Sequence, residues 1–217
     1  MKTETQENYC TLYLVRHGET EWNVQGITQG QSESFLTEIG VKQAEETGEK
    51  LRSVKFHAIF SSDLSRAHKT AEIIKLDREL VIQTSQLLRE RSYGSFEKRH
   101  SDEFRNILKD KLKERENLPE SEYASFRLAS DVETDEEVVT RFLAQLREIV
   151  AKYTGKNVLV VSHGGCIRNF LIKMGYAERK NLSGGSFKNG GYAKVFSDGV
   201  DFFVKEVEGI RKPEGGE

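Results

Sequence analysis

Cysteine is scarce in this sequence: the 217 residues include only two, Cys10 and Cys166. Two cysteines are too few for a disulfide framework, and neither has a partner at the spacing typical of zinc ligands. We therefore expect both to be reduced thiols in a cytoplasmic protein. We predict no metal site and no cofactor.

Proline is equally scarce, with two residues, and no proline-rich or glycine-rich linker divides the chain. A chain of this length can bury one sizeable hydrophobic core, so we predict a single domain over residues 1–217. Residues 1–8 are polar, and the apolar run that follows at residues 10–15 is too short for a signal-peptide core or a membrane span. We expect neither export nor a membrane partner.

Neither positive nor negative residues are in clear excess. The 33 basic residues nearly balance the 35 acidic ones, which leaves a formal net charge of -2. Such a balance gives no positive field that would draw the chain onto nucleic acid. Any specificity for anions must therefore come from a local cluster of residues. The sequence does not reveal an oligomeric state, and a homodimer is compatible with it.

Short apolar runs alternate with helical patterns along the chain. Buried strands are predicted at residues 11–15, 57–60, 80–82 and 157–161, and an edge hairpin at residues 191–196 and 201–207. Helices are predicted after Thr37, an N-cap, after the capping box of Thr134 and Glu137, and after Gly164. This order predicts a three-layer α/β/α fold with a mainly parallel central sheet.

Residues 97–133 interrupt the alternation, because they are densely charged. We predict an insertion over the active site with one amphipathic helix, which carries Phe104, Ile107, Leu108 and Leu112. Two roles stay open for it: a lid that closes over substrate, or a solvated helix that only packs. Residues 209–217 are predicted to form a flexible tail.

Polar residues with a shared chemistry follow the predicted strands. In open parallel sheets, ligands bind beyond the carboxyl ends of the strands, so these residues should meet at one edge. The set comprises two histidines, two or three arginines and one carboxylate: Arg16 and His17, Arg66, Arg89 and Glu90, and His163 with Gly164. We expect them to surround one site.

This set suits phosphoryl transfer. Two arginine forks match the oxygens of a phosphoryl group, and the amides at the start of the helix after Gly164 offer an anion site. A neutral imidazole, that of His17, can attack phosphorus in line and form a phosphohistidine, while His163 would bind the phosphate as an electrophile. Glu90 is the candidate acid that protonates the leaving alkoxide.

A wider series of short motifs accompanies these residues. It comprises Arg16-His17-Gly18-Glu19-Thr20, Asn23, Gln29-Gly30, Leu36-Thr37, Gly40, Gln43-Ala44, Ser61-Ser62-Asp63-Leu64, Arg66, Thr70-Ala71 and Ser162-His163-Gly164-Gly165. Over about residues 12–192, the series resembles the histidine phosphatase superfamily, the phosphoglycerate mutase-like group. One departure is Lys98, which stands where many relatives have glycine.

The resemblance implies a role for each matched residue. His17 would be the phosphorylated nucleophile and Glu90 the proton donor. The phosphate pocket would consist of Arg16, Arg66 and His163, lined by Asn23, Gln29 and the backbone of Gly164.

Within the superfamily, residues 88–94 look like both the mutases and the TIGAR-type fructose-2,6-bisphosphatases, and residues 29–31 and 54–64 lean toward the latter. The mutases typically carry an Arg-Arg pair and a proline cluster in the insertion, whereas this insertion has only Pro119 and no adjacent arginines. We therefore predict a phosphomonoesterase, of the histidine acid phosphatase type, that releases phosphate from a small phosphorylated substrate such as a sugar phosphate or glycolytic bisphosphate. A phosphoglycerate mutase and a non-catalytic module that binds a phosphorylated ligand remain the alternatives.

Overall fold

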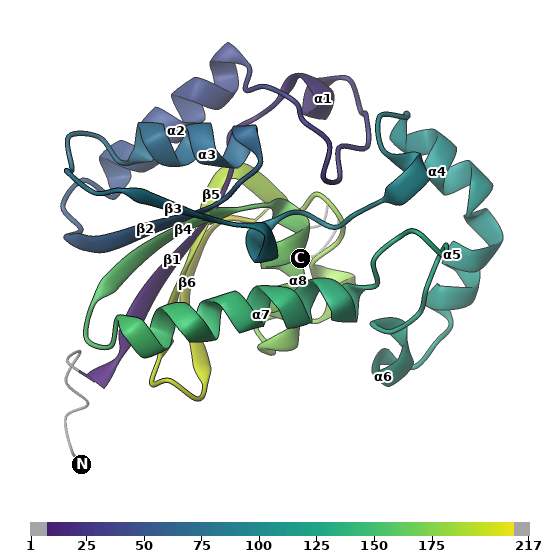
Figure 1. Cartoon of the computed structure of the whole chain (residues 1–217). Coiled ribbons are helices and arrows are strands. Elements are labelled where there is room, and N and C mark those ends of the chain that lie inside the picture. Colours follow the sequence, from purple (N-terminus) through teal and green to yellow (C-terminus); the bar gives the residue numbers. More distant parts are fainter. Residues whose placement is uncertain (1–7, 211–217) are drawn as a thin grey trace, which may run out of the picture.

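A six-stranded sheet in the order β3-β2-β4-β1-β5-β6 forms the centre of the molecule (Figure 1). The structure is a computed structural model that describes residues 8–210. Its strands are β1 (Cys10–Arg16), β2 (Phe56–Ser62), β3 (Ile82–Ser85), β4 (Asn157–Ser162), β5 (Phe187–Ser197) and β6 (Phe202–Ile210). Strands β1 to β4 pair in parallel, and β5 and β6 are added antiparallel at one edge. The predicted mainly parallel sheet and its terminal hairpin are therefore confirmed.

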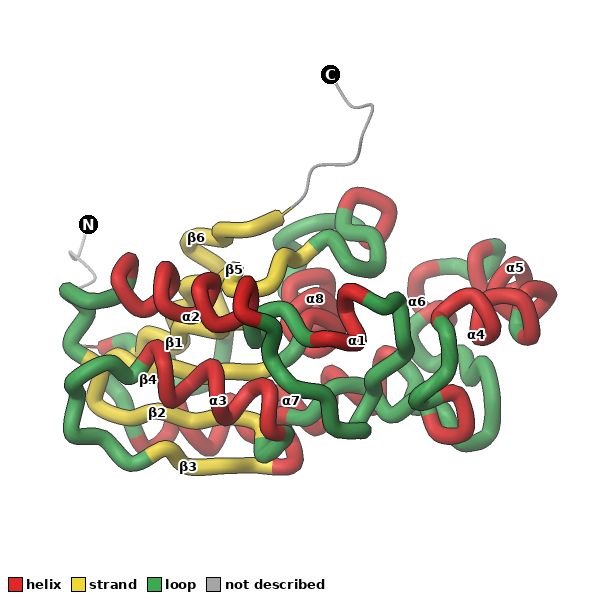
Figure 2. The backbone as a smooth tube through the Cα atoms, turned by 90° about the horizontal axis from the view of Figure 1, so that it is seen from above, coloured by secondary structure: helices red, strands yellow, loops and turns green. Residues whose placement is uncertain are grey.

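Helices cover both faces of the sheet, which completes the predicted three layers. One face carries α2 (Glu38–Lys50) and α3 (Ser65–Ile74), and the other carries α7 (Asp135–Lys152) and α8 (Gly164–Lys173) (Figure 1). Figure 2 shows the sheet from above, with α4, α5 and α6 gathered beyond one end of it.

Strand β1 shows why both faces are covered. Its side chains alternate between two hydrophobic cores: Leu12 and Leu14 pack with α7 and α8, whereas Tyr13 and Val15 pack with α2 and α3. Successive side chains of a strand point to opposite faces, so an apolar run without polar alternation needs a helix layer on each side. The central strands thus require the three-layer architecture.

The third strand differs from its prediction. Residues 80–82 were expected to be buried, but β3 begins at Ile82 and runs to Ser85, and Val81 is 83% exposed. As an edge strand, β3 pairs only with β2, so its position is set by that pairing and not by burial on both faces.

The charged insertion contains more helices than predicted. It forms α4 (Ser101–Ile107), α5 (Lys109–Glu116) and α6 (Glu120–Tyr123), and α4 and α5 break at Leu108. Leu108 is buried with Phe96, while Ile107 is 59% exposed. The prediction of one amphipathic helix was therefore wrong, because the small core under the insertion accepts only some of the apolar side chains of this segment.

The predicted start of the tail, at residue 209, is too early. Strand β6 continues to Ile210 and includes Gly209, so these two residues belong to the sheet. Residues 211–217 lie outside the described part of the chain.

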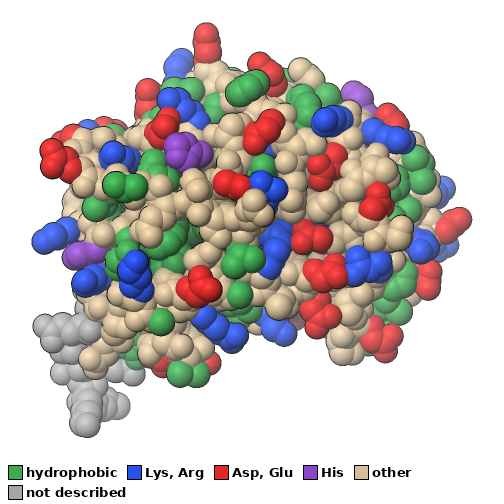
Figure 3. Space-filling model, viewed as in Figure 1, with side chains coloured by type: hydrophobic (Ala, Val, Ile, Leu, Met, Phe, Trp, Pro, Cys, Tyr) green, Lys and Arg blue, Asp and Glu red, His purple; other side chains and the backbone are tan. Residues whose placement is uncertain are grey.

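The surface carries charges of both signs. Figure 3 shows Lys and Arg side chains interspersed with Asp and Glu on one face of the molecule, as the balanced composition led us to expect. Between residues 8 and 210, no helix has the length and apolar content that crossing a bilayer requires.

Two glycines set the position of the loop that follows β1. A methyl group at Gly18 would overlap the backbone of Gly40 in α2, and a methyl group at Gly40 would overlap the carbonyl oxygen of Glu19. The two backbones are thus in direct contact. The close approach that Gly18 permits is to α2, which fixes the backbone around His17.

We predict that Gly40→Ala destabilises the protein by about 1–3 kcal/mol, because the added methyl group must push apart two backbone segments. Gly48→Ala in the same helix is the matched control, since its methyl group would first meet a flexible Leu76 side-chain atom at 3.3 Å. Alanine is the better helix former, so this control should be neutral or stabilising. Urea denaturation of both variants measures the difference. Equal stabilities for the two variants would contradict the backbone contact.

Candidate active site

The two predicted active-site histidines lie side by side. His17 follows β1 and His163 follows β4, and these strands are parallel neighbours with Arg16 opposite Ser162. The ring centroids are 5.1 Å apart, with 62° between the ring planes. Both side chains are buried, His17 at 3% and His163 at 0% exposure. The parallel pairing therefore brings together residues that are far apart in the sequence.

The protonation of His17 follows from its contacts. Its Nδ1 lies 2.7 Å from the carbonyl oxygen of Gly18, and a carbonyl can only accept a hydrogen bond. Nδ1 therefore carries the proton, and Nε2 keeps a free lone pair. Burial, followed by the charges of Arg66 and Arg16, lowers the pKa of His17 well below its ordinary value. The imidazole is neutral near pH 7, as a nucleophile must be.

Two arginines lie beside this imidazole. Arg66, in the first turn of α3, is 1% exposed and donates to the carbonyl oxygens of Gly30 at 2.7 Å and Ser32 at 2.8 Å. Arg16 donates to the carbonyl oxygen of Phe187. Both line a cavity of about 640 Å³ together with His17. Backbone carbonyls hold these guanidiniums without neutralising their charge.

His163 has no hydrogen-bond partner on either ring nitrogen among the described residues. Burial lowers its pKa well below the ordinary value, and the nearby charge of Arg66 adds to the effect. Buried polar groups are rarely left unsatisfied, and each one costs about 1–3 kcal/mol. A phosphoryl oxygen at this position would supply the missing partner.

The side chain of Glu90, which follows β3, lies against the first residues of α8. Its Oε2 accepts from the Gly165 amide at 2.9 Å, and its Oε1 accepts from the Arg91 amide at 2.8 Å. The Gly165 amide, which was expected to be part of an anion site for the ligand, therefore binds this side chain. Gly164 lines a cavity with Arg16 and Glu90, so the glycine lies where the sequence placed it.

Asn23 and Gln29 line the same cavity as His17. The Thr20 hydroxyl lies 3.1 Å from Asn23 Oδ1 and 3.0 Å from Gln29 Oε1. Asn189, which sequence reasoning missed, donates to the His17 carbonyl oxygen at 3.0 Å and to Asn23 Oδ1 at 3.3 Å. Its position before Gly190 is the signal that the sequence offered, and in the structure this part of β5 is irregular.

Arg89 does not join the group. Its guanidinium is bidentate with Asp63, at 2.7 and 2.6 Å, and this contact lowers the pKa of Asp63. The third arginine that the sequence allowed is therefore held by a carboxylate. Within residues 8–210, no cluster of His, Cys, Asp or Glu is arranged to hold a metal ion.

The geometry and the motifs agree with one known family. The family model of the histidine phosphatase superfamily (branch 1) matches residues 12–207. This chain belongs to that superfamily. Its members among the relatives below include proteins named as mutases and as phosphatases.

A probable phosphoglycerate mutase GpmB from Citrobacter koseri is 36% identical over 173 residues, which is 78% of each chain. An uncharacterized phosphatase PhoE from Bacillus subtilis is 35% identical over 161 residues, 74% of this chain and 75% of that protein. The solved structure of Bacillus stearothermophilus YhfR superposes with a TM-score of 0.80 at 31% identity, over 94% of this chain and 98% of that one. The phosphoglycerate mutase-like fold is therefore confirmed.

We predict that Gly165→Ala impairs proton donation, because the new methyl group would overlap the Glu90 carboxyl group. The loss in kcat/KM, which reports the step in which the leaving group departs and not the later hydrolysis of the phosphohistidine, should reach roughly 10²-fold with an alkyl phosphate and be much smaller with p-nitrophenyl phosphate, whose leaving group needs no acid. Steady-state kinetics with both substrates tests this, and Glu90→Gln should show the same pattern. An equal loss with both substrates would mean that the acid is elsewhere.

We also predict that stability falls as the pH drops below about 6.5, the ordinary pKa of histidine. The unfolded chain then binds protons that the buried imidazoles of the folded protein reject, so each contributes a slope of up to about 1.4 kcal/mol per pH unit. Urea denaturation between pH 5 and 7.5, in buffer without phosphate, measures the slope. His163→Asn removes one such group and should give a shallower slope; an unchanged slope would contradict the prediction.

Proposed function

We propose that this protein is a phosphomonoesterase that hydrolyses a small phosphorylated metabolite through a phosphohistidine at His17. The observation that carries the proposal is the hydrogen bond from Nδ1 to the Gly18 carbonyl oxygen, at 2.7 Å, because it leaves Nε2 as a buried and unprotonated nucleophile. Arg16 and Arg66 lie beside it and donate to backbone carbonyl oxygens, which carry no full negative charge.

In the first half-reaction, His17 Nε2 attacks phosphorus and the bond to the leaving oxygen breaks. Glu90 gives its proton to that oxygen, so that an alcohol departs. Arg16, Arg66 and His163 stabilise the charge on the phosphoryl oxygens. The neutral imidazole and the charged guanidiniums have separate tasks in this step.

In the second half-reaction, water attacks the phosphohistidine and Glu90 takes the proton from that water. The P–N bond breaks, phosphate leaves, and His17 returns to its starting tautomer. These groups supply the nucleophile, the acid and the charge stabilisation, so we propose that turnover needs neither a metal ion nor an organic cofactor.

The proposal favours hydrolysis over mutase activity. The insertion has one proline, Pro119, and no Arg-Arg pair of the kind typical of the mutases. The TIGAR-type likeness of residues 29–31 and 54–64 favours a sugar bisphosphate among the candidate substrates. A mutase remains the second candidate, because a 36% identical relative carries that name.

We predict that His17→Ala abolishes release of inorganic phosphate from 3-phosphoglycerate, fructose 1,6-bisphosphate and p-nitrophenyl phosphate, whereas the wild-type protein releases it in the presence of EDTA. His68→Ala is the matched control, because His68 lies on the surface of α3 beside Glu72. Acid-labile, base-stable labelling of the wild-type protein by ³²P-substrate should disappear in His17→Ala.

The other outcomes of these assays would assign a different function to the chain. Formation of 2-phosphoglycerate from 3-phosphoglycerate without free phosphate would make the chain a mutase. Binding of the phosphorylated compounds without turnover would make it a non-catalytic module. Undiminished turnover in His17→Ala would refute the assigned nucleophile.

A further inference from the structure

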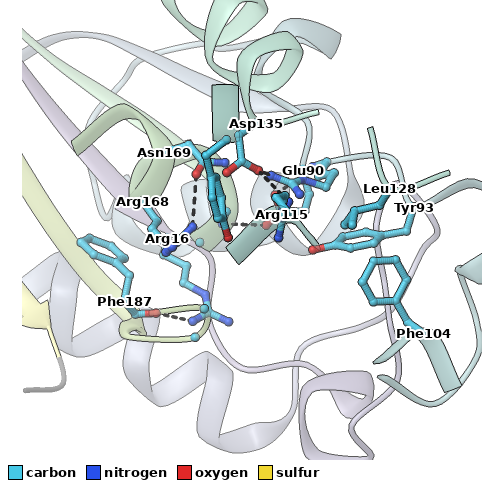
Figure 4. Close-up of a pocket in the computed structure, with 16 residues that line it drawn as sticks. Arg16, Glu90, Tyr93, Phe104, Arg115, Leu128, Asp135, Arg168, Asn169 and Phe187 are labelled. Atoms are coloured by element: carbon cyan, nitrogen blue, oxygen red, sulfur yellow. Dashed lines mark hydrogen bonds and ion pairs between the residues drawn. The ribbon is translucent and has the colours of Figure 1, made fainter. Parts of the chain in front are cut away.

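The cavity around His17 continues into a second pocket that the reaction above does not use. Arg16 and Glu90 line both, and the second pocket, of about 340 Å³, extends toward α7 and α8. Figure 4 shows Arg115, Arg168 and Asn169 around it. The leaving group of a substrate would extend into this second pocket, because Glu90 lies between the pocket and the cavity around His17.

Positive charge is in excess at this pocket. Asp135, whose side chain is 5% exposed, accepts from Arg91 and from Arg179 at 2.6 Å, and lies 4.0 Å from Arg115. One buried carboxylate thus faces three guanidiniums. Each of these is itself largely buried, with 10–14% of the side chain exposed.

Arg168 adds a fourth charge to the cluster. Its hydrogen bonds run to the Leu182 carbonyl oxygen and to Asn169 Oδ1 at 3.2 Å, and neither acceptor is charged. Burial, and then the neighbouring Arg179, lowers the pKa of Arg168 to about 10, so it is still a cation near pH 7. Tyr123 offsets part of the charge, since its ring faces Arg115 at 4.6 Å and Arg179 at 4.1 Å.

Two donors in this pocket lack a partner among the described residues. Asn169 is 4% exposed, and its Nδ2 makes no hydrogen bond, although its Oδ1 is held by Arg168. The Nε of Arg115 is likewise buried and unsatisfied. Buried donors that lack a partner, beside an Arg168 guanidinium whose hydrogen bonds run to uncharged acceptors, are complementary to an oxyanion.

We propose that Arg115, Arg168 and Asn169 bind a second anionic group of the substrate, so that the substrate is a phosphomonoester whose alcohol portion carries another oxyanion. The inference rests on the proposed function for the meaning of the first site. The oxyanion is a carboxylate or a second phosphate. Arg91 and Arg179 hold Asp135 and thereby position the pocket.

The test compares substrates that differ only in the second anion. 3-Phosphoglycerate is paired with glycerol 3-phosphate, and fructose 1,6-bisphosphate with fructose 6-phosphate. The wild-type protein should prefer the member with the second anionic group in at least one pair, by tenfold or more in kcat/KM. A preference within the first pair identifies a carboxylate, and a preference within the second pair identifies a phosphate.

Arg168→Met should lower kcat/KM for the preferred compound by about 10- to 100-fold and change that of its partner without the second anionic group by less than about threefold. Asn169→Leu should act in the same direction, and Arg168→Lys should restore part of the loss. Arg52→Met is the matched control, because Arg52 is exposed and pairs with Glu49 on α2. Equal losses for both members of a pair, in variants with wild-type thermal unfolding, would show that the arginines only hold the fold together.

A binding measurement separates this inference from the proposed function. In His17→Ala, calorimetric titration should show tighter binding of the compound with two anionic groups than of its partner with the phosphate alone, and Arg168→Met should remove the difference. This result would support the second oxyanion site even if the wild-type protein turned over none of the four compounds. Equal affinities within both pairs would overturn it even if the protein proved to be a phosphatase.

Discussion

The hydrogen bond between His17 Nδ1 and the Gly18 carbonyl oxygen is the constraint on which the candidate active site depends. It joins the His17 ring to the backbone of its own loop, and the Gly18 amide in turn donates to the Thr70 hydroxyl at 3.0 Å. The contact of Gly18 with Gly40 fixes the same loop against α2. The ring orientation and tautomer are therefore set by the packing of β1, α2 and α3, before any ligand binds.

This arrangement also explains how cations and a nucleophilic imidazole can share a small volume. A carboxylate bound to His17 would favour the charged imidazolium, whereas a carbonyl oxygen orients the ring without adding a full negative charge. The charges of Arg16 and Arg66 then act in the same direction as burial, because all three disfavour protonation. The arginines proposed to bind phosphate are thus also groups that keep the His17 imidazole neutral.

The proposed acid, Glu90, is oriented by other contacts. The Gly165 amide donates to its Oε2 and the Arg91 amide to its Oε1. The absence of a side chain at Gly165 is what makes room for the carboxyl group. His17 and Glu90 are therefore positioned by two glycines, Gly18 and Gly165, which follow the ends of the neighbouring strands β1 and β4.

The parts of the site that depend on strand order could be predicted from the sequence. The short apolar runs before His17 and His163 predicted buried strands, and parallel strands bring their carboxyl ends to one edge. Contacts between irregular segments could not be predicted, because no periodicity records them: the bond from Asn189 to His17 and the pairing of Arg89 with Asp63 are examples. Lys98 could be predicted in part: the resemblance implies glycine at this position, and the φ of Lys98, 67°, is one that glycine adopts readily.

Amino-acid composition does not reveal how charged residues cluster locally. The net charge of -2 gives no general positive field, yet Arg91, Arg115 and Arg179 come from separate segments and meet at the buried Asp135 carboxylate, and Arg168 lines the pocket beside them. Burying the Arg168 guanidinium among uncharged acceptors costs free energy, and an anion that replaces its lost hydration would recover it. A pocket of this kind beside the proposed phosphoryl site would favour ligands with negative charge at both ends.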